Sequence, residues 1–147
     1  MYFWKVDDLV ADLRDNNVTP KEEMKYLICW CLLAWLSLWF ISALPSEDAN
    51  IYEHASWFFS IFISVLGIYA CYRVNSEGDG KDFITRMICL SIPVVIRVSV
   101  LCLPFLLLGF GFGLIEEEYN LLDVVFSVVF SFVYVWYLYQ KMKAVSI

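Results

Sequence analysis

CLSIPVVIRVSVLCLPF, residues 89–105, contains a single charged residue, Arg97, among apolar and small residues. A run of this length and character is typical of a membrane-spanning helix, which needs roughly 17–25 residues. Because a guanidinium stays protonated inside proteins, Arg97 would carry a permanent charge into that helix. The stretch therefore predicts a membrane-spanning helix, and the role of Arg97 within it needs an explanation.

Three more segments share this apolar character. Hydrophobic residues make up 61% of the 147-residue chain, whereas soluble domains contain roughly 45–50%. The excess is concentrated in four segments, residues 20–44, 55–72, 87–108 and 120–140. We therefore expect one all-α transmembrane domain over residues 1–147, an integral membrane four-helix bundle with a short cytosolic helix at residues 3–15.

The basic residues predict an orientation for this bundle. All of them except Arg97 precede the first span or lie in its first turns, connect the second span to the third, or follow the fourth: Lys5, Arg14, Lys21, Lys25, Arg73, Lys81, Arg86, Lys141 and Lys143. The two other connections, residues 45–54 and 109–119, carry acidic residues and neither lysine nor arginine. Since cytoplasmic loops are enriched in lysine and arginine, we expect a multi-pass protein of the bacterial inner (plasma) membrane with both termini in the cytoplasm.

The sequence lacks the residue patterns of enzymes and cofactor sites. The one histidine, His54, stands in a connection beside Glu53, and the five cysteines include no C-x-x-C pair. A metal site needs several such ligands together, and acid–base catalysis needs positioned partners. The net charge of −6 argues against a nucleic-acid partner. We expect a protein that is not an enzyme and has no catalytic residue, no metal and no cofactor.

Residues 3–15 form a separate amphipathic segment. Phe3, Val6, Val10 and Leu13 recur at helical spacing, and the positions between them are mostly charged. Two interpretations are open: the helix packs on the protein's own cytosolic face, or it is a docking site for a cytosolic protein partner. The next segment, Thr19-Pro20-Lys21-Glu22, has the residues of a capping box that would start the first long helix.

Phe3–Leu27 reads FWKVDDLVADLRDNNVTPKEEMKYL and resembles the opening of small bacterial four-helix inner-membrane proteins of uncharacterised function. The resemblance covers this segment alone and includes no catalytic motif. It implies a bacterial membrane setting and brings no activity with it.

Small residues line one face of two of the expected spans. The positions are Ser56, Ser60, Ser64 and Gly67 in the second span and Asp123, Ser127, Ser131 and Tyr134, at the same steps, in the fourth. Small residues at this spacing allow membrane helices to approach closely. We expect these faces to pack inside the bundle or against another subunit of a homo-oligomer. In the third span, Pro93 and Pro104 predict bends.

The expected depth of Arg97 follows from counting along the third span. Arg86 marks the expected cytosolic edge of this span, and Arg97 follows eleven residues later. At a rise of about 1.5 Å per residue, Arg97 lies roughly 16 Å deep, near the middle of the bilayer. The same count brings Trp35, Ser37, Ser64 and Ser131 to this level, and leaves Asp123 near the outer end of its span. We expect serine hydroxyls of the second or fourth span beside Arg97, and water, a bound anion, a carbonyl freed by a proline, or Trp35 beneath the guanidinium to complete its compensation. A structural arginine, an anion- or water-lined cavity, and contact with a lipid headgroup are the open alternatives.

These observations favour one class of function. We expect an oligomeric, non-enzymatic membrane protein that acts as a membrane-embedded sensing or interaction subunit, or as an effector of membrane integrity, with a cytosolic partner and with host defence as one setting. Its immediate surroundings would be the lipid bilayer and further copies of the chain. The alternative is an oligomeric channel or small transporter for an anion that uses Arg97.

Overall fold

The computed structural model describes residues 4–43, 51–111 and 120–146, with side chains for all of these except 37–43, 106, 110 and 111. The described residues form five helices: α1 (Val6–Arg14), α2 (Pro20–Ala43), α3 (Ile51–Glu77), α4 (Phe83–Gly111) and α5 (Leu121–Ser146). The all-α prediction is confirmed for this part of the chain. The acidic connections fall largely at residues 44–50 and 112–119, outside the described residues.

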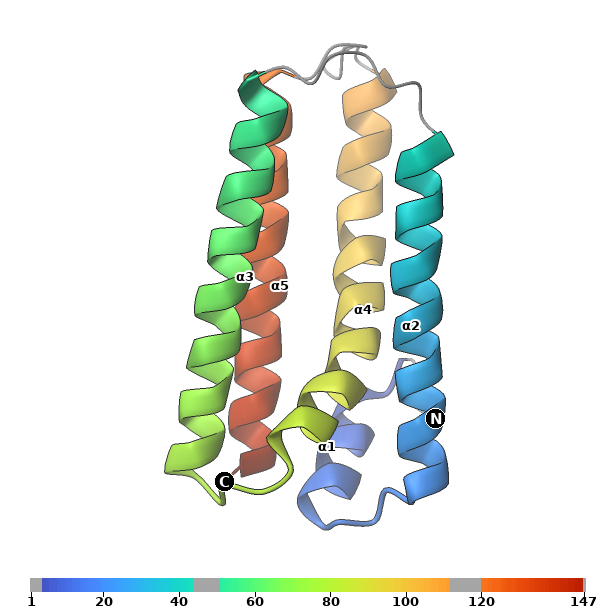
Figure 1. The fold of residues 1–147 in the computed structure, drawn as a ribbon, viewed down its shortest axis with the longest axis vertical. Helices are drawn as coiled ribbons and strands as arrows, with labels where there is room; N and C mark the ends of the chain where they lie inside the picture. Colours follow the sequence, from blue (N-terminus) through green and yellow to red (C-terminus); the bar gives the residue numbers. More distant parts are fainter. Residues whose placement is uncertain (1–3, 44–50, 112–119, 147) are drawn as a thin grey trace.

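Figure 1 shows the four long helices running side by side, with α3 next to α5 and α4 next to α2. Three of them, α3, α4 and α5, are long and apolar enough to cross a membrane. The short helix α1 lies at the end where α3 finishes and α4 begins, against α4 and α5. At that end α3, α4 and α5 all extend beyond the expected spans.

The beginnings of α2 and α5 follow from local sequence. Glu22 reaches back to the backbone N–H of Thr19 at 3.4 Å, which is the reciprocal contact of a capping box. At α5, the side chain of Asn120 accepts the N–H of Leu122 at 2.8 Å, and Asp123 accepts the N–H of Asn120 at 2.9 Å. These contacts satisfy donors that the first turn of a helix leaves without partners.

Small residues bring α3 and α5 together within one chain. The hydroxyls of Ser60 and Ser127 lie 3.0 Å apart, and Ser131 donates to Ser60 at 3.3 Å. Farther along, Gly67 is so close to Val135 that a Cβ there would lie within 2.7 Å of a Val135 methyl group. We call this contact the serine seam.

The other small residues of these faces contribute differently. Ser56 is buried on α3. Ser64 is exposed, and its hydroxyl donates to the carbonyl of Ser60 in its own helix at 2.8 Å. The helix α4 continues through both prolines, with Pro93 buried and Pro104 exposed. Bends at these prolines remain a prediction.

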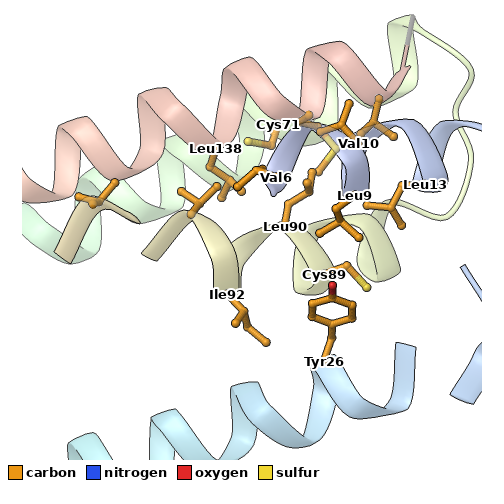
Figure 2. Close-up of a cluster of buried hydrophobic side chains, with 14 residues drawn as sticks. Val6, Leu9, Val10, Leu13, Tyr26, Cys71, Cys89, Leu90, Ile92 and Leu138 are labelled. Atoms are coloured by element: carbon orange, nitrogen blue, oxygen red, sulfur yellow. The ribbon is translucent and has the colours of Figure 1, made fainter. Parts of the chain in front are cut away.

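The hydrophobic core occupies the α1 end of the molecule (Figure 2). The apolar face of α1 contributes Val6, Leu9, Val10 and Leu13, each at most 7% exposed. They pack in one cluster with Tyr26 of α2, Cys71 of α3, and residues of α4 and α5 that include Leu90 and Leu138. Burying such side chains is worth about 1.5–3 kcal/mol each, so α1 is an integral part of the fold. Along α4 the buried positions end at Val98, and apolar side chains are exposed from Val100 onward.

We expect Gly67→Ala to lower the free energy of unfolding by about 1–3 kcal/mol, because the added methyl group overlaps Val135 and forces the helices apart. Denaturant unfolding of the protein in detergent, followed by circular dichroism, measures the loss. Val135→Ala in the same chain makes room for the methyl group and should restore most of the stability. An equal loss in the single and double variants would show that the close contact does not determine stability.

Candidate functional site

Arg97 lies on α4 beside the last buried position, Val98, and it faces α5 and the residue that precedes α1. Its Nη1 donates to the Tyr137 hydroxyl at 2.7 Å, and its Nη2 donates to the backbone carbonyl of Trp4. The Trp4 ring centroid is 5.8 Å from the guanidinium carbon, within the range of a cation–π contact. The Arg97 Nε is buried and, among the described residues, has no hydrogen-bond partner.

A second cation lies close to the same tyrosine. Lys141, one turn along α5, donates to Asp7 of α1 at 2.6 Å, and its Nζ lies 5.3 Å from the Tyr137 ring centroid. The hydrogen bond with Lys141 holds the pKa of Asp7 below its usual value. Burial opposes this effect, and the charges of Lys141 and, to a smaller extent, Arg97 lower the pKa further. Tyr137 therefore contacts both cations, and the N-terminal segment contacts Arg97 through Trp4 and Lys141 through Asp7. We call Trp4, Asp7, Arg97, Tyr137 and Lys141 the Arg97 network.

The partners of Arg97 differ from those expected. Serine hydroxyls were expected from the neighbouring spans, but the structure places a tyrosine hydroxyl and a main-chain carbonyl there. The expected aromatic residue, Trp35, is 64% exposed on α2, and Trp4 takes its place. The difference arises because a helix-by-helix depth count leaves out α1, which brings Trp4 to the guanidinium.

The other polar candidates have local partners. Ser131 belongs to the serine seam, and Asp123 accepts the backbone N–H at the start of α5. The side chain of Ser37 is outside the described residues. Arg97 is thus bonded to the N-terminal segment, whereas Ser131 bonds to α3 and Asp123 bonds at the start of its own helix.

Sequence reasoning missed a second arginine site at the connection between α3 and α4. Arg86, taken as a marker of the membrane edge, is 1% exposed. It forms two bonds to the carboxylate of Asp79, at 2.5 and 2.6 Å, and one to Asn75 at 3.0 Å. Asn75 also donates to the carbonyl of Lys81 at 3.2 Å. Arg86 is thereby neutralised and holds the connection in shape.

We expect Asp79→Asn to lower the free energy of unfolding by about 3 kcal/mol, because it leaves a buried guanidinium without its carboxylate. The hydrogen bond from Arg86 holds the pKa of Asp79 below its ordinary value of 3.8. The stabilisation is therefore present above pH 3.8 and is lost as the pH falls through the lowered pKa. Unfolding measured from neutral to acidic pH should show the two proteins converging only below pH 3.8. Convergence already at higher pH would contradict this assignment.

Two cavities lie outside the Arg97 network. The larger, about 310 Å³, is lined by residues of all four long helices, including Trp30, Ser64, Met87 and Tyr134. The smaller, about 150 Å³, lies at the α1 end beside Asn16, Glu23 and Arg86. Arg97 lines neither of them.

Within the described ranges, histidine, cysteine, aspartate and glutamate nowhere gather in a group of three that could hold a metal ion. No protein-family model, curated protein or solved structure matches the chain. The role of the Arg97 network is therefore inferred from its own geometry.

We expect Tyr137→Phe to loosen α1, because Nη1 of Arg97 loses its hydrogen-bond acceptor while the apolar contacts stay in place. Hydrogen–deuterium exchange of the amides of Val6–Arg14 should become about tenfold faster. Tyr139→Phe is the matched control, since Tyr139 lies on the same helix outside the Arg97 network. Similar exchange in both variants would show that the bond does not hold α1.

Proposed function

We propose that this chain is a non-enzymatic, oligomeric four-span protein of the bacterial inner membrane that acts as a sensing or interaction subunit for a cytosolic partner. The observation that carries the proposal is the bond between Arg97 and Trp4, which joins a long apolar helix to the segment that begins α1. A change at α1 would reach α4 directly through this bond. The resemblance of Phe3–Leu27 to the opening of small bacterial inner-membrane proteins agrees with this setting.

The distribution of apolar side chains supports a membrane placement with α1 at the cytoplasmic surface. Exposed apolar side chains on α3 extend to Tyr72, and those on α5 extend to Trp136, beside Tyr137. On α4, which runs in the opposite direction, Ile84 is exposed at the start of the helix, and the next exposed apolar side chain is Val100. Aromatic residues are enriched where a membrane meets water, and arginine extends its head toward that boundary.

This pattern favours a shallower position for Arg97 than the midplane depth obtained by counting from Arg86. The half of α4 between the two arginines is covered largely by protein, so its apolar residues do not measure membrane thickness. With Arg97 near the inner boundary, all the basic residues would lie on the cytoplasmic side or at its edge. Both ends of the chain would then face the cytoplasm.

The two faces of α1 suggest how a partner would bind. Its apolar face is buried against the other helices, which agrees with packing on the protein's own cytosolic side. The opposite face presents Asp8, paired with Lys5 at 3.7 Å, and, just past the helix, Asp15, paired with Arg14 at 3.8 Å; the two carboxylate side chains are 56% and 59% exposed. Acidic residues outnumber basic ones along this segment, so a partner would meet a mixed, net acidic surface that a basic patch would complement. Such a surface also suits an effector of membrane integrity that is released by its partner, as in host defence.

The alternative, an anion channel or small transporter that uses Arg97, ranks second. The guanidinium already bonds to a hydroxyl and a carbonyl of the same chain, and it lines neither of the two cavities. An anion path past Arg97 would first require Trp4 to move.

Further copies of the chain would pack against the exposed apolar faces of the long helices, since the serine seam is occupied by the contact between α3 and α5.

A photo-reactive amino acid at Asp8 or Asp15 should form an adduct with a soluble protein in intact cells, because both positions face outward from α1. The same probe at Ser76, exposed at the end of α3, is the matched control and should not form this adduct. With the probe at Asp8, Asp15→Lys should weaken the adduct, and with the probe at Asp15, Asp8→Lys should do the same, in both cases without changing the oligomer mass in detergent. Identical adducts at all three positions, or none, would contradict a partner site on α1.

A further inference from the structure

The charges and donors of the Arg97 network do not balance. Two cations, Arg97 and Lys141, share one carboxylate, that of Asp7. The Nη2 of Arg97 bonds to a neutral carbonyl, and the adjacent Nε has no partner among the described residues although it is buried. Buried polar groups are nearly always hydrogen-bonded, so an orphaned donor calls for an explanation.

We propose that Arg97, Tyr137 and Lys141 form a binding site for a phosphate monoester, and that Trp4 and Asp7 cover this site when it is empty. The inference rests on the proposed function, because it names the ligand class that the sensing subunit would detect. A phosphate would take the place of the Trp4 carbonyl on Arg97 and of the Asp7 carboxylate on Lys141.

The donor set suits a phosphate. The Nε and Nη2 edge of a guanidinium offers two parallel N–H groups that match two oxygens of a phosphate. Tyr137 accepts a bond from Nη1 and keeps its own hydroxyl proton free to donate, and Lys141 supplies an ammonium one turn away. A phosphate monoester carries roughly 1.5–2 negative charges at pH 7. It would therefore neutralise both cations, which Asp7 alone does not.

The cover can move without unfolding α1. Trp4 precedes the helix and is 59% exposed. The Asp7 side chain is 76% exposed, whereas that of Lys141 is 18% exposed. The Asp7 carboxylate can therefore turn into water at little cost, and Lys141 stays in place. The apolar face of α1 would stay buried while Trp4 and the Asp7 side chain turn away. Ligand binding would thereby change the position of Trp4 and Asp7 at the cytoplasmic surface.

Two sources could supply the phosphate group. The shallow position proposed for Arg97 brings it to the level of lipid headgroups, where the headgroup of phosphatidic acid would reach it. The exposed Trp4 also leaves a route from the cytosol for free phosphate. The two sources share their chemistry and can be told apart by experiment.

The test uses the full chain purified in a maltoside detergent, which contains no phosphate. In one arm, native mass spectrometry compares phosphatidic acid with diacylglycerol of the same acyl chains. In the other, inorganic phosphate is titrated by calorimetry. Binding of the lipid alone assigns the headgroup as ligand, and binding of inorganic phosphate assigns the free anion. Failure of both ligands to bind overturns the proposal.

Asp7→Asn provides the sharpest variant, because it removes the competing carboxylate and should strengthen binding about tenfold. Asp8→Asn is its matched control and should leave affinity within about twofold, since Asp8 pairs with Lys5 outside the site. A gain in affinity cannot result from misfolding. Equal effects of the two variants, or none, would refute the role of Asp7 as a cover.

Arg97→Lys and Lys141→Gln should each weaken binding about tenfold, because each removes a charge-assisted hydrogen bond. Lys143→Gln, on the same helix, is the control and should bind normally. An equal loss in Lys143→Gln would reduce the site to general surface charge and overturn the proposal. These binding measurements include no partner protein. Phosphate binding can therefore be absent while the adduct at Asp8 is found, and phosphate binding can be present while no adduct forms.

Discussion

The α1 end of this molecule is arranged around one permanent charge that needs hydrogen-bond partners. Arg97 lies on a helix whose other residues nearby are apolar, and an unpaired guanidinium in such surroundings is costly. Its compensation comes from Tyr137 on α5 and from the main chain at Trp4. A carbonyl from outside the long helices can serve only if α1 is held against them, which the burial of Val6 and Leu9 achieves. The hydrophobic packing of α1 and the charge of Arg97 are thus parts of one arrangement.

The serine seam supplies the framework on which this arrangement is built. Because Ser60, Gly67 and Ser127 are small, α3 and α5 approach closely along the serine seam. That alignment places Tyr137 and Lys141 beside α4 and α1. Hydrogen bonds between membrane helices are individually modest, about 0.6 kcal/mol on average. Close packing, as at Gly67 and Val135, therefore contributes more to the stability of this pair.

Local patterns in the sequence predicted where the helices lie. Apolar runs predicted four long helices, and the structure has helices at each of them, three of which are long and apolar enough to span a membrane. Thr19 and Glu22 predicted the start of α2, and the matching steps of Ser60 and Ser127 predicted faces that the structure brings together. All of these depend on neighbours within a few residues or on helical periodicity, which sequence displays directly.

The contacts of the two arginines could not be obtained in this way. Trp4 and Arg97 are 93 positions apart, and only the packing of α1 brings them together. Arg86 was read as a residue at the membrane edge because the distribution of basic residues says where a charge lies and nothing about its burial. Asp79 and Asn75, seven and eleven positions before it, were the available signal, since both lie in or beside the short connection that precedes α4.

The comparison of these two arginines gives the strongest physical reason to assign a role to Arg97. Both are on α4, and both are held by groups from other parts of the chain. Arg86 is neutralised by a bidentate carboxylate and further bonded to an amide, so its role is complete within the folded chain. Arg97 donates to the Tyr137 hydroxyl and to the neutral carbonyl of Trp4. It interacts with the Asp7 carboxylate only through its charge, and its buried Nε has no partner among the described residues. A fold that can satisfy one guanidinium fully, eleven residues away, leaves the other incomplete, and an incomplete donor set beside an exposed, movable residue is what a site awaiting an anion requires.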